Sequence, residues 1–224
     1  MTGHVTLVGG GPGDPDLMTV GGLRAIQNAD VIAYDRLAPL EVLAEAHPDA
    51  LLIDVGKEPH GRQTSQDAIN ELLITHARAG RHVVRFKGGD GYVFGRGGEE
   101  ALACADAGVP VRVIPGVSSA IAGPALAGIP VTHRSLTQGF TVVSGHVPPG
   151  DERSTLDWSA LARLNTTLVI LMGTTHLAAI AAALVSDGKP AATPAAIVQQ
   201  AGRPEQRVLR ATLGSIADAA RAHG

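Results

Sequence analysis

Three glycine-rich segments that each carry charged side chains are the parts of this sequence best suited to binding and chemistry. They are Gly9-Gly10-Gly11-Pro12-Gly13-Asp14, Lys87-Gly88-Gly89-Asp90 and Gly95-Arg96-Gly97-Gly98-Glu99-Glu100. Glycine lets a ligand approach the backbone closely, because no side chain lies in between. A carboxylate such as Asp90 can pair with an ammonium group or accept a hydrogen bond from a ribose hydroxyl. The segments therefore predict a ligand site.

The first glycine segment does not fit the common nucleotide-binding motifs. A GxGxxG fingerprint that starts at Gly9 needs glycine at position 14, where the chain has Asp14. Pro12 also removes a backbone N–H from a loop that would bind pyrophosphate. No GxxxxGK(S/T) sequence occurs in the chain. The segment therefore favours a compact ligand without phosphates, with a tight turn that binds nothing as the structural alternative.

Alternating strands and helices are predicted to position these segments. Short β-branched runs predict strands at residues 5–9, 30–34, 51–55, 82–86 and 109–115. Apolar residues at helical spacing predict helices at 19–28, 65–79 and 100–107. This alternation implies a parallel sheet with helices on both faces. Ligands bind such sheets at the carboxyl ends of the strands, where the first two glycine segments lie.

The second half of the chain predicts another α/β unit with a less regular alternation. Strands are expected at 140–144, 167–172 and 195–199, and helices at 176–186 and 213–222. Pro115-Gly116 is a candidate hinge between the halves. We therefore expect an α/β protein of two domains, residues 1–115 and 116–224.

The composition limits the classes of function. Hydrophobic residues make up 45% of the 224 residues and charged residues 17%, which allows a sizeable core. A net charge of −3 argues against general affinity for nucleic acid. No apolar run reaches the roughly 20 residues of a membrane span, and the N-terminus does not read as a signal peptide. The single cysteine, Cys104, and the absence of CxxC, HxH and HExxH motifs predict a cytoplasmic protein without a metal.

A series of motifs, in order along the chain, resembles one enzyme family. The motifs span Gly11–Asp14, Tyr34–Leu37, Val55–Lys57, Arg85–Asp90, Phe94–Glu100, Ile114–Ser119, Gly128–Arg134, Ser144–His146 and Leu171–Gly173. They cover nearly the whole chain, from about Val5 to the last predicted helix. The chain resembles the tetrapyrrole methyltransferases, and among them the uroporphyrinogen-III C-methyltransferases.

The resemblance implies S-adenosylmethionine as methyl donor, S-adenosylhomocysteine as product, and a homodimer. It implies two α/β domains with the active site in the cleft between them. The matching cofactor residues are Pro12, Gly88, Gly89, Asp90, Val93, Ser118, Ser119, Met172 and Ala201. Two positions depart from the family pattern: Gly91 stands where proline is usual, and Ala201-Gly202 replaces a Gly-Thr pair. Neither departure alters the cofactor assignment.

The resemblance also implies transfer of two methyl groups to carbons 2 and 7 of uroporphyrinogen III, which gives precorrin-2. Asp35 and Lys57 match acid/base positions, and we count Arg96 with them as catalytic. The residues expected to face the macrocycle are Arg36, Arg96, Glu99, Arg134 and Met172. The macrocycle carries many carboxylates, and the planar guanidinium of arginine fits a carboxylate better than the ammonium of lysine.

Several alternatives stay open at this point. Asp35 could cap the helix that follows, and Lys57 could be an ordinary loop lysine. Glu99 and Glu100 suit the first turn of a helix as dipole partners. The rival functions are a related methyltransferase that acts on a later corrin intermediate or on a modified histidine, an NAD(P)-linked oxidoreductase, and a ligand-binding module without catalysis.

Overall fold

The chain forms two compact units, Met1–Ala122 and Gly123–Gly224, in a computed structural model that describes residues 3–56 and 64–223. The division falls inside helix α4 (Ser119–Leu126). The boundary expected from the sequence, at residue 115, precedes that helix. Each unit has its own hydrophobic core.

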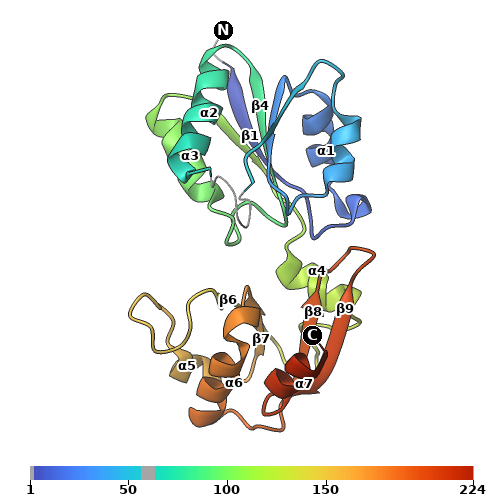
Figure 1. The fold of residues 1–224 in the computed structure, drawn as a ribbon, viewed down its shortest axis with the longest axis vertical. Coiled ribbons are helices and arrows are strands. Elements are labelled where there is room, and N and C mark those ends of the chain that lie inside the picture. Colours follow the sequence, from blue (N-terminus) through green and yellow to red (C-terminus); the bar gives the residue numbers. More distant parts are fainter. Residues whose placement is uncertain (1–2, 57–63, 224) are drawn as a thin grey trace. The chain divides into compact units, whose positions relative to one another are not determined.

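The first unit is built on a five-stranded parallel sheet (Figure 1). The strands lie in the order β3 (Leu51–Asp54), β2 (Val31–Tyr34), β4 (His82–Lys87), β1 (His4–Gly9) and β5 (Val111–Ile114). All neighbouring strands are parallel, which confirms the predicted α/β class. Because β1 lies between β4 and β5, the loops that follow these three strands meet at one edge of the sheet.

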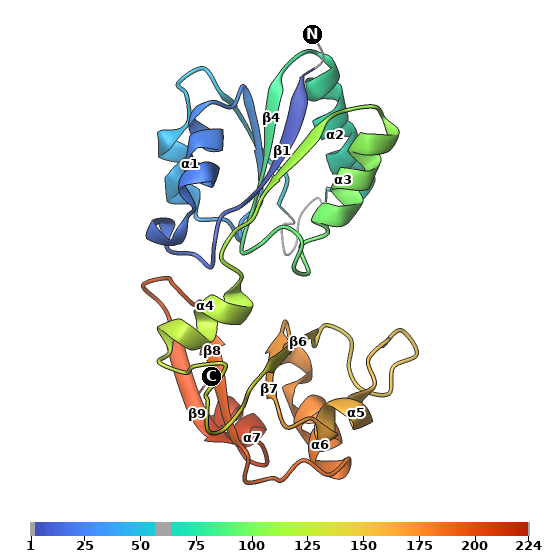
Figure 2. The same ribbon diagram turned by 180° about the vertical axis from the view of Figure 1, so that it is seen from behind.

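Helices cover both faces of this sheet. Helix α1 (Val20–Gln27) lies on one face, and α2 (Gln66–Arg78) and α3 (Gly97–Asp106) lie on the other, as the opposite views in Figure 1 and Figure 2 show. The α1 face buries Val8, Ala25, Ile26, Ile32, Val84 and Phe86. The α2 and α3 face buries Val5, Leu7, Val31, Ala33, Ile69, Leu73, Val83 and Cys104. Side chains that alternate along each strand therefore enter different cores.

Polar side chains cap the starts of α1, α2 and the short helix before α1. Thr19 Oγ1 accepts the N–H of Gly22 at 3.1 Å, and Ser65 Oγ accepts that of Ala68 at 3.1 Å, so that each hydroxyl satisfies an N–H in the first turn. Asp14 accepts the N–H of Asp16 at 2.9 Å before the short 3-10 helix η1 (Pro15–Leu17). A second 3-10 helix, η2 (Leu40–Glu45), follows β2.

The second unit combines two small sheets. Strands β6 (Phe140–Ser144) and β7 (Thr167–Leu171) are parallel, and β8 (Pro194–Gln199) and β9 (Arg207–Thr212) form an antiparallel pair. Its helices are α5 (Trp158–Arg163), η3 (Thr174–His176), α6 (Leu177–Ser186) and α7 (Ile216–His223). Its core is formed by Val143, Trp158, Leu161, Ala162, Ile180, Ala181, Leu184, Leu213 and Ile216. The sequence pattern predicted β6, β7, β8, α6 and α7 and missed α5 and β9.

Candidate active site

Close backbone contacts hold together the loops that follow β1, β4 and β5. A Cβ atom added at Gly116 would lie 2.2 Å from the carbonyl oxygen of Gly89 and 2.5 Å from the carbonyl carbon of Gly9. One added at Gly9 would lie 2.5 Å from the amide nitrogen of Gly116. These distances are far below van der Waals contact, so any side chain at Gly9 or Gly116 would push the loops apart.

A short antiparallel bridge joins the first two glycine segments. The N–H of Gly11 donates to Gly89 O at 3.1 Å, and the N–H of Gly89 donates to Gly11 O at 2.6 Å. Both residues have positive φ, 84° at Gly11 and 62° at Gly89, which glycine adopts most readily. A Cβ atom at Gly89 would meet nothing closer than the amide nitrogen of Ser119, at 3.9 Å. Gly89 therefore leaves backbone uncovered on an open side, as close contact with a ligand requires.

The carboxylate of Asp90 connects the loop after β4 to the loop after β5. Its Oδ1 accepts the N–H of Tyr92 at 2.8 Å, and its Oδ2 accepts the N–H of Gly116 at 3.0 Å. A carboxylate has about four lone-pair sites, so both oxygens keep capacity for a further donor such as a ribose hydroxyl. Asp90 thus has a structural role beside the ligand-binding role expected for it.

The structure places the predicted cofactor residues in two groups. Seven follow the strands of the parallel sheet in the first unit, namely Pro12, Gly88, Gly89, Asp90, Val93, Ser118 and Ser119. Ser118 also accepts the N–H of Ala120 at 3.3 Å near the start of α4. The other two, Met172 and Ala201, follow β7 and β8 in the second unit.

Left-handed backbone conformations coincide with the predicted site residues. In the described ranges the non-glycine residues with positive φ are Phe94, Arg96, Met172 and Gln200. Two of them are predicted site residues, and the other two adjoin Val93 and Ala201. Such conformations are unfavourable for side chains other than glycine, and they concentrate at functional sites in proteins. The local strain therefore supports these loops as the functional part of the chain.

Asp35, the first of the predicted acid/base residues, belongs to a largely buried ion cluster. Its Oδ2 lies 3.2 Å from Nη2 of Arg85, and Nε of Arg85 lies 3.0 Å from Oε1 of Glu100. Nζ of Lys87 lies 3.1 Å from the same Glu100 oxygen. Asp35 does not cap a helix, because η2 begins at Leu40. Lys57, the second acid/base residue, lies outside the described residues.

The arginines expected to bind the macrocycle differ in their present partners. Arg96 forms a bidentate contact with Glu99, at 2.9 and 2.7 Å, and its hydrogen bonds lower the pKa of Glu99. Nε of Arg36 lies 3.8 Å from Oδ2 of Asp54. Arg134 is exposed, and within residues 3–56 and 64–223 it has no ion pair. Of these three arginines, Arg134 is therefore the one that can bind a carboxylate of the ligand without first breaking an ion pair with a carboxylate of the protein.

Arg85 and Lys87 are not among the site residues predicted from the sequence, and Glu100 is predicted only as a possible partner of the helix dipole. A usable signal was present, because Arg85 and Lys87 are two residues apart in a strand and alternate with the apolar Val84 and Phe86. Side chains at that spacing lie on the same face of a strand. Two buried cations on one face require a buried anion, which Glu100 in the first turn of α3 provides.

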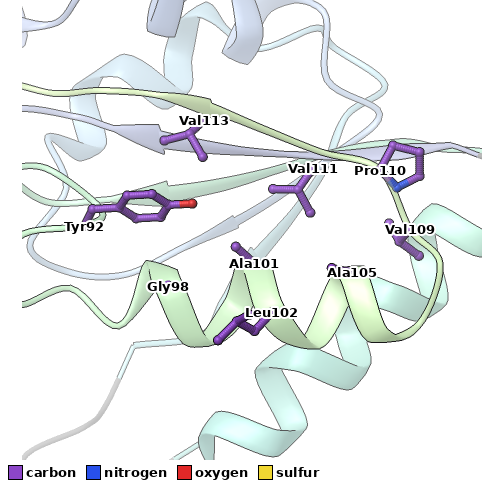
Figure 3. Close-up of a pocket in the computed structure, with 9 residues that line it drawn as sticks. All are labelled: Tyr92, Gly98, Ala101, Leu102, Ala105, Val109, Pro110, Val111 and Val113. Atoms are coloured by element: carbon purple, nitrogen blue, oxygen red, sulfur yellow. The ribbon is translucent and has the colours of Figure 1, made fainter.

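The first unit has a surface hollow that is separate from the predicted site residues. It has a volume of about 650 Å³ between α3 and β5, and Figure 3 shows its apolar lining, which includes Tyr92, Leu102, Val111 and Val113. None of the predicted site residues lines it. The lining offers no carboxylate, imidazole or ammonium group for catalysis, so we place the candidate site at the carboxyl ends of the strands.

Within residues 3–56 and 64–223, no group of three or more His, Cys, Asp or Glu side chains is arranged to hold a metal ion. In the same ranges, no helix is both long and apolar enough to cross a bilayer.

Comparison with known proteins gives strong matches. The chain is 48% identical over 223 residues to the uroporphyrinogen-III C-methyltransferase of Methanocaldococcus jannaschii, covering 99% of this chain and 91% of that protein. It is 47% identical over 215 residues to siroheme synthase 1 of Yersinia pseudotuberculosis, covering 96% of this chain but 45% of that protein. The chain thus spans about half the length of the siroheme synthases it matches.

Solved structures of methyltransferases are also similar to this chain. The uroporphyrin-III C-methyltransferase of Thermus thermophilus complexed with S-adenosylhomocysteine matches with a TM-score of 0.81 and 44% identity, over 96% of this chain and 86% of that one. Residues 4–217 match the family described as Tetrapyrrole (Corrin/Porphyrin) Methylases. The chain belongs to the tetrapyrrole methylase family.

Proposed function

We propose that this chain is a C-methyltransferase that uses S-adenosylmethionine to methylate uroporphyrinogen III at carbons 2 and 7, giving precorrin-2. The match that carries the proposal is the Methanocaldococcus jannaschii methyltransferase, because the similarity extends over 91% of that protein. The proposal includes a homodimer, as the family resemblance implies, and a location in the cytoplasm, as the single cysteine predicts.

The loops after β1, β4 and β5 would hold the cofactor. Gly89 presents open backbone, and the hydrogen bonds of Asp90 and Gly11 fix the loops around it. The residues of the first unit in this role are Pro12, Gly88, Gly89, Asp90, Val93, Ser118 and Ser119. When bound, S-adenosylmethionine supplies an electrophilic methyl group on a sulfonium centre. For Met172 and Ala201, of the second unit, the cofactor role stays a prediction.

Asp35 is the residue suited to manage charge during the reaction. The β-carbons of a reduced pyrrole are enamine-like nucleophiles, so positive charge develops on the ring as the new carbon–carbon bond forms. A carboxylate stabilises that charge and accepts the proton that the ring then loses. The side chain of Asp35 is 22% exposed, so it can reach a ligand while it contacts Arg85. Lys57 keeps its predicted acid/base role.

Arg36, Arg96 and Arg134 would bind carboxylates of the macrocycle. Binding at Arg96 exchanges its contact with Glu99 for one with the ligand, which reduces the net gain in free energy. Arg134 gains a charge-assisted hydrogen bond without such an exchange. Glu99 would set the strength of the Arg96 contact, and Met172 keeps its predicted place beside the macrocycle.

The direct experiment is to incubate the chain anaerobically with uroporphyrinogen III and S-adenosylmethionine and to determine the mass of the product. We expect a product with two added methyl groups and two equivalents of S-adenosylhomocysteine. An enzyme that leaves uroporphyrinogen III unchanged but methylates a later corrin intermediate would instead have the alternative function.

Two glycine substitutions test the cofactor site. Gly89→Ala and Gly108→Ala both place a side chain at positive φ, 62° and 70°, so each should destabilise the fold by about 1–2 kcal/mol. A Cβ atom at Gly108 would meet nothing within 4 Å, and the residue lies between the end of α3 and the start of β5, away from the carboxyl ends of the strands. Calorimetry should show at least about tenfold weaker binding of S-adenosylhomocysteine in Gly89→Ala alone. Equal affinities in the two variants would remove Gly89 from the cofactor site.

The arginines allow a separate test of macrocycle binding. Arg134→Ala should weaken it by about tenfold to a hundredfold, the equivalent of 1.5–3 kcal/mol for a charged hydrogen bond. Arg96→Ala should lose less because of its contact with Glu99, and Arg134→Lys should recover part of the loss. Arg221→Ala, which removes an exposed ion pair with Asp218 near the C-terminus, is the control. Each variant is titrated with the macrocycle and, separately, with S-adenosylhomocysteine. If an arginine variant loses affinity for both ligands equally, the arginine supports the fold and does not bind the macrocycle.

A further inference from the structure

The ion cluster of Arg85, Lys87 and Glu100 is unusual in its burial. The side chains are 4%, 5% and 0% exposed. Glu100 Oε1 accepts hydrogen bonds from Arg85 and Lys87 and also from Nε2 of Gln66 at 3.3 Å. Its Oε2 has no partner among the described residues. The cost of this burial is visible at Lys87, whose pKa is lowered chiefly by desolvation and further by the charge of Arg85.

Stability alone explains such a cluster poorly. Well-packed apolar side chains in place of a buried ion network are often as stable or more stable. The surroundings here are apolar, since Val31, Ala33 and Val83 belong to the same face of the sheet. A role of the cluster outside folding is therefore the better explanation, and Asp35 is the partly exposed residue that it contacts.

The guanidinium of Arg85 is fixed from several directions. Its Nε donates to Glu100, and its Nη1 donates to the carbonyl oxygens of Ala33 at 3.3 Å and Phe86 at 3.0 Å. Only its Nη2 donates to Asp35. The other oxygen of Asp35 accepts the N–H of Leu37 at 3.1 Å. Both oxygens of this carboxylate are therefore held by groups that have little freedom to move.

We propose that Arg85 and Glu100 are positioning residues that hold the carboxylate of Asp35 in its working orientation. The inference rests on the proposed function, which gives Asp35 its role at the developing positive charge. The formal charges of Asp35, Arg85, Glu100 and Lys87 sum to zero when all are ionised. Lys87 thereby offsets Glu100, so that Arg85 remains available to Asp35. A carboxylate held in this way needs no reorganisation when positive charge appears on the ring.

A double-mutant cycle between the cluster and Asp35 tests this role. The cluster variant combines Arg85→Met, Lys87→Met and Glu100→Leu, so that no ion is left buried without a partner. We expect Asp35→Asn to lower kcat by about a hundredfold and the cluster variant to lower it by about tenfold or more. Because the cluster acts through Asp35, its loss should matter little once Asp35 has been replaced. The kcat of the variant that combines the cluster changes with Asp35→Asn should therefore be within about twofold of the kcat of Asp35→Asn alone.

Binding and stability measurements separate positioning from structural damage. In the cluster variant, the Kd for S-adenosylhomocysteine and the KM for uroporphyrinogen III should stay within about twofold of the parent, and Tm should not fall. Arg78→Met is the matched control, because Arg78 of α2 donates to Ala107 O at 2.8 Å and so links α2 to the end of α3. Its effect on kcat should be small and should multiply with that of Asp35→Asn.

Independent, multiplying losses of kcat in the cluster variant and in Asp35→Asn would overturn the positioning role and leave the proposed function standing. A parent chain that transfers no methyl group to uroporphyrinogen III would overturn the proposed function instead. Should the cluster variant not fold, Glu100→Gln keeps the shape of the side chain and removes its charge. Glu100→Gln is then combined with Asp35→Asn. Losses of kcat that do not multiply support the positioning role, and losses that multiply contradict it.

Discussion

The contact between Gly9, Gly89 and Gly116 is the constraint on which the candidate site depends. Backbone lies directly on backbone there, with no room for a Cβ atom at Gly9 or Gly116. This contact aligns the loops after β1, β4 and β5, and Asp90 then connects the latter two through the N–H of Gly116. Gly89, in the same contact, leaves its own Cβ direction open. The same three residues therefore do two things: they pack the loops together, and they leave open backbone that can receive a ligand.

The twofold alternation of β4 links this edge of the sheet to the chemistry proposed for Asp35. Val84 and Phe86 enter the core under α1, whereas Arg85 and Lys87 lie on the opposite face, where Glu100 of α3 meets them. The same strand continues into Gly88 and Gly89. One segment of six residues thus supplies the backbone proposed to hold the cofactor and also Arg85, which holds Asp35. For a substitution in this segment, cofactor affinity and kcat must both be measured, because the first reports on the glycine backbone and the second on the contact with Asp35.

The sequence predicted those parts of the structure that depend on local pattern. Buried parallel strands appear as β-branched runs, and the glycine segments mark the loops at their ends. The six-residue helix α5 is too short for helical periodicity. Strand β9 has Arg207 at its start and Arg210 two residues before its end, and these charges obscured its pattern. The spacing of Arg85 and Lys87 indicates a buried charged site, but their partners come from α3 and from the loop after β2, and no local pattern encodes these long-range contacts. The contact of Arg96 with Glu99 is local in sequence, but the sequence pattern does not indicate the left-handed backbone at Arg96 that accompanies it.

Amide hydrogen exchange with and without S-adenosylhomocysteine tests the central claim, that the glycine loops of the first unit hold the cofactor. We predict that the ligand slows exchange in residues 9–13, 88–91 and 116–119, while the segment 101–111 beside the apolar hollow is unchanged. Ligand binding that is detected by calorimetry but leaves exchange in the glycine loops unaltered would contradict this account.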